Sequence, residues 1–277
     1  MIPNGIGVFY VLFSTVYLFL VYSVYSFNLI SITSNAIKPL TLAVCILFGG
    51  FMGLLDDWMD VRWRYKAFLP LIAAIPLIVL ASNLGLRATF ALPFLGTLDF
   101  GQYYYFLIIP LLVTVFTNTV NQLGGLNGLE TICPAIVMIG LMVISGENAI
   151  LLFGPLAIWL VLAFLNFEGK IFVGNTGSFA IGMTLAAFAI ISDVKFTLAV
   201  SLLPYIFNSA LILLTFFFFR TKASVRLEDG KLVSDHKRSL ITLVTYHRPL
   251  TEKQIVVVIA CVVAITTLIP VLFNLLL

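Results

Sequence analysis

Long apolar runs separated by short polar segments make up most of the sequence. Because a helix needs roughly 20 predominantly apolar residues to cross a bilayer, runs of about this length predict membrane-spanning helices. The pattern predicts an all-α, polytopic membrane protein with about nine such helices. The expected spans are 6–28, 38–55, 67–83, 103–117, 131–145, 149–166, 176–192, 196–219 and 254–277.

The composition excludes a soluble protein. Of the 277 residues, 61% are hydrophobic and 10% are charged, whereas soluble domains carry about 25% charged residues. The longest polar stretch, 220–253, is too short for a separate domain, so we interpret 1–277 as a single membrane domain. Within it, the apolar segment 238–247 is too short to span the bilayer and is expected to be a helical piece at the membrane interface.

The positive charges are divided unequally between the two expected sides. Of the 15 Lys and Arg residues, only Lys38, Arg87 and Lys195 fall outside four loops on one side. The positive-inside rule therefore places the N-terminus and these loops in the cytoplasm and the C-terminus outside. A net charge of +3 is too small to indicate a nucleic-acid partner. The four loops expected to form the active face are 56–66, 118–130, 167–175 and 220–253.

Carboxylates gather where the 38–55 run ends. Asp56, Asp57 and Asp60 follow it directly, and a basic run, Arg62–Lys66, comes next. Clustered carboxylates at a helix end suit Mg²⁺ or supply a general base, and the cations beyond them suit phosphate oxygens. A solvated helix terminus explains the cluster equally well, because similar clusters occur in unrelated proteins.

A polar, glycine-rich segment covers 118–130. Asn118 and Asn121 are three residues apart and share a helix face. The glycines between 124 and 128 let the backbone approach a ligand closely. Asn127 offers a donor and an acceptor, which suits the edge of a uracil-like ring. The alternative is a set of helix-packing glycines with polar bonds between helices, which the polar surroundings disfavour.

Two further segments carry candidate chemistry. The run Phe172–Ser178 opens a predicted span, and the start of a helix favours anions. Capping by Thr or Ser alone explains this run as well, and is favoured when the run is considered in isolation. The loop 220–253 holds many cations together with His236, for which attraction to anionic lipid headgroups is the simple alternative.

Taken together and in this order, these segments resemble the polyprenyl-phosphate N-acetylhexosamine-1-phosphate transferase family. More narrowly, the chain is similar to the archaeal and eukaryotic dolichyl-phosphate N-acetylglucosaminephosphotransferases, a branch of glycosyltransferase family 4. The resemblance covers nearly the whole chain. The motifs that carry it are Gly53–Asp57, Arg62–Lys66, Asn118-x-x-Asn121, Gly125–Glu130, Phe172–Thr176 and Gly182–Thr184.

The resemblance implies a reaction between a nucleotide sugar and a membrane lipid. A polyisoprenyl (dolichyl) phosphate attacks the β-phosphate of UDP-N-acetylglucosamine, which releases UMP and starts lipid-linked glycan assembly. It also implies Mg²⁺ as cofactor and leaves a homodimer open as the assembly. The family fold has ten helices, and this chain is expected to lack the first of them.

The resemblance also assigns roles to individual residues. Lys66 would contact the transferring phosphates, and Asp56 and Asp57 would orient or deprotonate the lipid phosphate. Asn121 and Asn175 would hold Mg²⁺. The residues expected to bind the nucleotide sugar are Gly125, Asn127, Glu130, Phe172, Arg220 and Arg226.

Three departures from the family pattern affect these expectations. Asn175 stands where the family has Asp, which removes a negative charge beside the metal. Asn4 stands where relatives often have Glu. The family's sugar-reading Arg-His-Arg cluster has only loose counterparts in Arg220, Lys222, Arg226 and His236.

The departures keep a second hypothesis open, a catalytically weak or silent member that acts as a membrane subunit or scaffold. A transporter is disfavoured because the polar groups gather at one face and not at the bilayer midplane. The short loop before the last span favours an archaeal cell membrane, with the endoplasmic reticulum membrane as the eukaryotic alternative.

Overall fold

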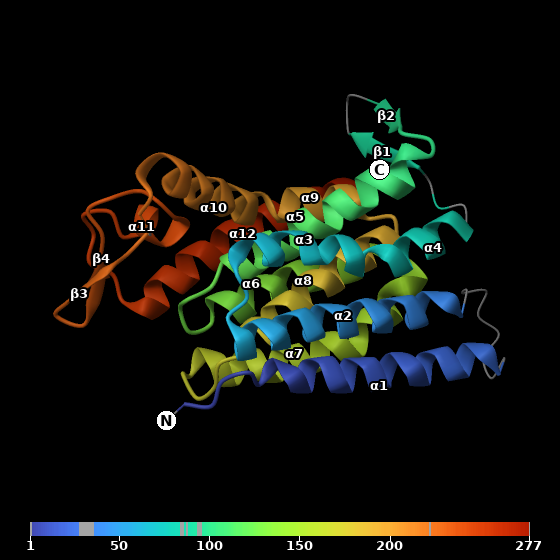
Figure 1. Cartoon of the computed structure of the whole chain (residues 1–277), viewed down its shortest axis with the longest axis horizontal. Helices are drawn as coiled ribbons and strands as arrows, with labels where there is room; N and C mark the ends of the chain where they lie inside the picture. Colours follow the sequence, from blue (N-terminus) through green and yellow to red (C-terminus); the bar gives the residue numbers. More distant parts are fainter. Residues whose placement is uncertain are drawn as a thin grey trace.

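The computed structural model describes residues 2–27, 36–83, 86, 88–92, 96–221 and 223–276, so Arg87 and Lys222 lie outside the described residues. The chain is a bundle of long helices lying side by side (Figure 1). This confirms the prediction of an all-α, polytopic membrane protein.

Each of the nine predicted spans is helical in the described chain. Seven helical segments are long and apolar enough to cross a membrane, and a bent pair makes an eighth. The ninth, α6 (Leu129–Ile144), is shorter, at 16 residues. The seven are α1 (Gly7–Ser26), α2 (Ile37–Met59), α3 with α4 (Trp63–Ala73, Ile75–Asn83), η1 with α5 (Tyr104–Ile108, Ile109–Gln122), η2 with α7 (Gly146–Ala149, Ile150–Phe167), α8 (Gly174–Ile191) and α12 (Glu252–Leu276).

The bent pair divides the predicted span 196–219. Helix α9 (Lys195–Ser201) meets α10 (Leu203–Leu214) at an angle of 54°, and η3 (Thr215–Phe219) continues α10. Pro204 stands at the start of α10, where its missing amide does not interrupt a helical hydrogen bond. Proline therefore marks the point at which one apolar run becomes two helices.

Helix α8 forms the centre of the bundle. It contacts α1, α2, α4, α5, α6 and α9, and every residue from Thr176 to Ile191 is buried. Small residues allow this packing, as is usual between membrane helices. A Cβ at Gly53 of α2 would lie 2.1 Å from the carbonyl oxygen of Asn175, and a Cβ at Gly7 of α1 would lie 2.3 Å from the Cα of Gly177. Glycine at these two positions brings α1 and α2 against the first turn of α8.

Two small β-hairpins lie at opposite ends of the bundle (Figure 1). Strands β1 (Thr89–Leu92) and β2 (Gly96–Asp99) pair with Thr89 opposite Asp99. Strands β3 (Arg226–Glu228) and β4 (Lys231–Val233) pair at the other end, beside the short helix α11 (Leu240–Val244). The backbone N–H of Leu240 donates to the side-chain oxygen of Asn208 on α10. The predicted helical piece within 238–247 is therefore confirmed as a short helix docked on the bundle.

Candidate active site

The loops predicted to form the active face converge at the end of the bundle that carries β3, β4 and α11 (Figure 1). Hydrogen bonds join them. The carboxylate of Asp57 at the end of α2 accepts from Thr176 at the start of α8, and the backbone N–H of Phe172 donates to the carbonyl of Pro3. The side chain of Asn127 donates to Glu252 at the start of α12. Residues far apart in the sequence therefore surround one site.

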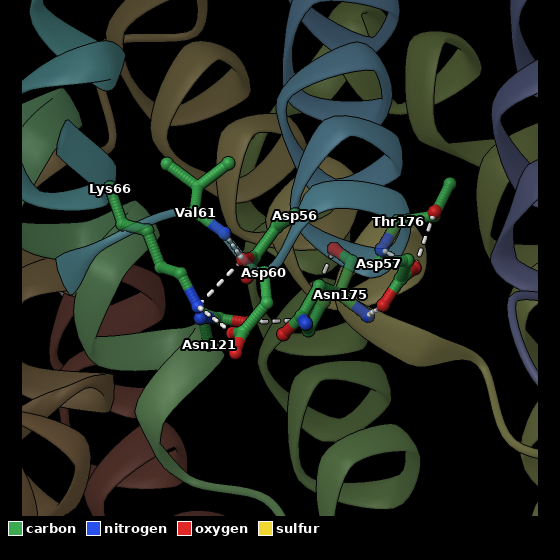
Figure 2. Close-up of polar contacts among 9 residues, drawn as sticks. Asp56, Asp57, Asp60, Val61, Lys66, Asn121, Asn175 and Thr176 are labelled. Atoms are coloured by element: carbon green, nitrogen blue, oxygen red, sulfur yellow. Dashed lines mark hydrogen bonds and ion pairs between the residues drawn. The ribbon is translucent and has the colours of Figure 1, made fainter.

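Asp57 anchors the first turn of α8 (Figure 2). Its two carboxylate oxygens accept from the backbone N–H groups of Asn175 and Thr176 at 2.8 and 2.9 Å, and the Thr176 hydroxyl donates to it at 2.7 Å. A carboxylate at a helix N-terminus satisfies N–H groups that have no partner within the helix. Asp57 thus fixes the place of Asn175, in addition to any contact that it makes with substrate.

Asp56 and Lys66 form a largely buried ion pair. The Lys66 ammonium lies 2.6 Å from Asp56, whose side chain is 1% exposed, and 3.9 Å from the fully exposed Asp60 (Figure 2). The same Asp56 oxygen accepts from the backbone N–H of Val61 at 3.1 Å. Its other oxygen is buried and has no hydrogen-bond partner in the part of the chain that the structure describes. The pair holds one cation at a defined position on the active face.

The two predicted metal ligands lie beside each other, joined by Ser178. The Ser178 hydroxyl donates to the side-chain oxygen of Asn121, and it lies 3.3 Å from the backbone oxygen of Asn175. Among the described residues, no group of three or more His, Cys, Asp or Glu side chains could hold a metal ion. Any metal here would therefore need amide oxygens or substrate phosphates among its ligands.

The glycine-rich segment forms a tight turn between α5 and α6. Gly125 and Gly128 have positive φ angles of 93° and 92°, which favour glycine. The carboxylate of Glu252 accepts from the backbone N–H of Asn127 at 2.6 Å and from its side-chain amide at 3.3 Å. The buried Asn166 accepts from the N–H of Gly128 at 2.8 Å and donates to the carbonyl of Ile171. The turn is therefore held from two sides.

A polar pocket of about 480 Å³ opens beside this turn. It brings together four of the residues predicted to bind nucleotide sugar or metal, namely Gly125, Glu130, Phe172 and Asn175, and also Asp57. None of the described residues that line it is basic. The full lining is Ile2, Asn4, Asp57, Gly125, Leu126, Glu130, Phe172, Gly174 and Asn175.

One carboxyl group of this pocket has a raised pKa. Glu130 lies at the polar end of α6, and its pKa is raised to about 7, chiefly because the carboxyl group is buried. The nearby carboxylate of Asp57 contributes to this increase, while a backbone hydrogen bond from Val173 opposes it. Two carboxylates, those of Asp57 and Glu130, therefore repel each other in one pocket, and a cation placed there would reduce this repulsion.

A second, mainly apolar groove lies between α3, α5 and α10. It consists of two adjoining hollows of about 500 and 630 Å³, which share Trp63, Lys66, Gln122 and Leu213. Asn121 lines the first hollow, and the Trp63 and Phe216 rings meet edge to face at 5.8 Å beside the second. Among the described residues, Lys66 is the cation that lines both hollows.

The structure does not bring every predicted residue to the pockets. Arg220 ends η3 and is exposed, and Arg226 on β3 pairs with Asp235. Neither lines the polar pocket or the groove, although both lie at the same end of the bundle. Asn127 supports the turn but is not part of the pocket lining.

Three residues that shape the site have no role in the sequence-based predictions. Asn166 is polar within an apolar run, which is a usable signal. Ser178 belongs to the Phe172–Ser178 run but received no role. Glu252 begins the last helix, and nothing in the local sequence connects it with Asn127.

Comparison with known proteins identifies the family. Residues 39–193, more than half of the chain, match the family model described as glycosyl transferase family 4. The chain belongs to glycosyl transferase family 4. The matched region contains the Asp56–Lys66 pair, the glycine-rich turn and the start of α8, so this family 4 chain carries the centre of the site within the family's shared region.

Similar proteins extend the match along this family 4 chain. A protein of Saccharolobus solfataricus, provisionally named a UDP-N-acetylglucosamine–dolichyl-phosphate N-acetylglucosaminephosphotransferase, is 34% identical over 259 residues, which cover 90% of this chain and 79% of that protein. The protein with that name in Schizosaccharomyces pombe is 30% identical over 200 residues, or 62% of this chain and 44% of its own length. A phospho-N-acetylmuramoyl-pentapeptide-transferase of Prochlorococcus marinus is 27% identical over 218 residues, or 72% of this chain and 59% of that protein. The resemblance drawn from the motifs is confirmed.

Proposed function

We propose that this family 4 transferase moves N-acetylglucosamine 1-phosphate from UDP-N-acetylglucosamine to a polyisoprenyl (dolichyl) phosphate and releases UMP. One observation carries the proposal: Asp57 lines a polar pocket and Lys66 lines an apolar groove, and Asp56, the neighbour of Asp57 in the sequence, pairs with Lys66. A nucleotide sugar suits the pocket and an isoprenyl chain suits the groove, because each matches the chemistry of its lining. The names of the archaeal and yeast relatives support the same pair of substrates.

The chemistry requires positioning more than proton transfer. An oxygen of the lipid phosphate forms a bond to the β-phosphorus of the nucleotide sugar, and the bond between that phosphorus and the bridging oxygen breaks. UMP leaves with the electron pair, and no net proton is taken up when both phosphate monoesters are dianions. Phosphoryl transfer of this kind depends on orientation and on charge neutralisation.

Lys66 is the residue placed to neutralise charge. Its ammonium lies where the two hollows of the groove meet, beside Asp56. A phosphate at the head of a lipid in the groove would therefore reach Lys66. One carboxylate oxygen of Asp56 holds the ammonium in position. The other oxygen has no hydrogen-bond donor among the described residues that would draw the carboxylate away from Lys66. The ion pair thus orients the incoming phosphate.

The polar pocket fits Mg²⁺. A diphosphate entering it would meet Asp57 and Glu130 without a basic side chain in the described lining, so a cation must offset the charge. Glu130 and Asn175 line the pocket, and Asn121 lies beside it, joined to Asn175 by Ser178. Their carboxylate and amide oxygens are hard donors, which Mg²⁺ prefers in combination with substrate phosphates. When bound, Mg²⁺ would supply charge neutralisation at the diphosphate. Asp57 would hold Asn175 in place through the N-terminus of α8.

We expect Asn175→Asp to lower the Mg²⁺ concentration needed for half-maximal activity. The substitution adds a negative charge beside the pocket, and Mg²⁺ binds a carboxylate more strongly than a neutral amide. Asn121→Ala should raise the requirement, because it deletes an oxygen donor. Mg²⁺ titrations of the initial rate measure both effects. Asn148→Asp adds the same charge near Lys38, at the opposite end of the bundle, and serves as control; coincident titration curves for wild type and Asn175→Asp would place the metal elsewhere.

The chain is an integral membrane protein, and we place its site on the cytoplasmic side. The excess of Lys and Arg in the loops at this end supports that orientation. The archaeal relative that matches 90% of the chain supports an archaeal cell membrane.

A direct assay separates this proposal from the alternative of a silent subunit. Purified protein in liposomes receives radiolabelled UDP-N-acetylglucosamine, polyprenyl phosphate and Mg²⁺. Labelled lipid together with an equal amount of UMP supports transfer. Folded protein that binds UDP-N-acetylglucosamine and yields neither product would instead support a scaffold, a role that the neutral Asn175 favours.

A further inference from the structure

We infer that Glu252 is a positioning residue for the nucleotide, acting through Asn127. The inference rests on the proposed function, because it assigns the base-reading role to the turn at the polar pocket. Glu252 opens α12 and reaches across to the turn between α5 and α6. Its two carboxylate oxygens accept from the backbone N–H and the side-chain amide of Asn127, at 2.6 and 3.3 Å. The contact joins the last helix of the bundle to the turn.

Glu252 is rigidly placed for this contact. The backbone N–H of Thr251 donates to the side chain of Gln254 at 2.9 Å, and the Gln254 N–H lies 3.4 Å from the Thr251 hydroxyl. These reciprocal hydrogen bonds form a capping box at the start of α12. Helix α12 also packs along α6, which begins immediately after the turn. The Glu252 side chain is therefore left to bind the turn from a fixed helix.

The contact determines which way the Asn127 amide points. A carboxylate can only accept hydrogen bonds, so it must face the NH₂ group of the amide and not its oxygen. The amide oxygen of Asn127 is consequently turned away from Glu252, and it is buried without a hydrogen-bond partner among the described residues. An acceptor left unsatisfied in this way costs free energy until a donor reaches it. Gly125 and Leu126, which line the polar pocket, immediately precede Asn127.

The orientation of the Asn127 amide determines which nucleotide base can hydrogen-bond to it. A uracil ring carries a hydrogen on N3 and can donate it to the amide oxygen, whereas N3 of cytosine carries none and can only accept. With Glu252 present, Asn127 offers an acceptor, and uridine nucleotides are preferred. Without the carboxylate, the amide can turn over and present its NH₂ group, and the preference weakens.

Binding of UMP and CMP to the purified protein, measured by calorimetry, tests the inference without requiring turnover. We expect Glu252→Gln to bind UMP about tenfold more weakly than wild type, because the side chain loses its charge and one of its two acceptor oxygens. The ratio of CMP to UMP dissociation constants should also fall. Glu228→Gln removes the same charge from an exposed position on β3 and should bind both nucleotides as wild type does. Affinity for a short-chain polyprenyl phosphate should be the same in all these proteins.

A double-mutant cycle makes the test specific to Asn127. In an Asn127→Ala background, Glu252→Gln should no longer change the ratio of CMP to UMP dissociation constants, because the side chain that reads the base has gone, although the backbone hydrogen bond to residue 252 remains. Equal UMP binding by wild type and Glu252→Gln would overturn the inference, and so would an unchanged effect on this ratio in the double variant or a parallel loss of lipid-phosphate affinity. If Glu252→Gln does not fold, Glu252→Asp keeps the acceptor but shortens its reach and permits the same comparison. Wild-type protein that binds no UMP would instead overturn the proposed function itself.

Discussion

Lys66→Ala is expected to lower the rate of sugar-phosphate transfer by about 10²–10³-fold, or roughly 3–4 kcal/mol in the barrier. Lys66 is the one cation that faces both hollows of the groove in the described chain, and it lies 2.6 Å from Asp56. Its removal takes away the charge that meets the phosphate and also leaves the Asp56 carboxylate buried without its partner. Initial rates at saturating substrates measure the effect.

The two consequences of this substitution can be separated. The double variant Asp56→Asn with Lys66→Met removes the ion pair without leaving an unpaired charge, so it should be more stable than Lys66→Ala. It should nevertheless remain inactive, since the phosphate still lacks its cation. Lys231→Ala, on the exposed hairpin β3–β4, is the matched control and should transfer at the wild-type rate. Well-folded Lys66→Ala protein with near-normal turnover would exclude Lys66 from the reaction.

Gly53→Ala should damage both the bundle and the site. A methyl group at this position would lie 2.1 Å from the carbonyl oxygen of Asn175 and 2.5 Å from the Cα of Thr176. These atoms are backbone, so α2 and α8 must move apart. Overpacking of this kind costs about 1–3 kcal/mol, and the displaced part of α8 is the turn that Asp57 anchors. We expect a lower melting temperature together with a large loss of activity.

Thermal unfolding in detergent and the transfer assay measure the two effects of Gly53→Ala. Leu54→Ala is a suitable control, because Leu54 is the next residue on α2 and its side chain is 48% exposed on the outside of the bundle. Gly53→Ala protein with the melting temperature and activity of wild type would show that α2 and α8 tolerate a wider separation than the structure has.

The helices were predictable from sequence because membrane insertion requires long apolar runs. All nine predicted runs are helical, and α1 and α12 agree with prediction to within a few residues. The sequence did not distinguish α8 from its neighbours, since a helix buried in protein and a helix facing lipid can have the same apolar pattern. The bend before Pro204 and the two hairpins were also missed, because short strands and helix breaks depend on local contacts.

Only those parts of the site that lie close together in the sequence were predictable. Asp56 and Lys66 are ten residues apart, so their proximity could be expected before any fold was known. The role of Asp57 as the anchor of α8 depends on a contact with Thr176 across the bundle, and the role of Glu252 depends on a contact with Asn127. Contacts between distant segments arise only from the packing of the helices.

The burial of α8 also has a consequence for how the protein is made. This helix carries Asn175, Thr176, Ser178 and Thr184 into the bundle and exposes almost none of its surface to lipid. It gains little by inserting alone, because its polar groups and close glycine contacts need protein around them. Of the described helices that pack closely against it, α1, α2, α4, α5 and α6 precede it in the chain and α9 follows. Because synthesis starts at the N-terminus, these five helices leave the ribosome before α8 does. Most of the protein surface that buries α8 is therefore made before α8 itself.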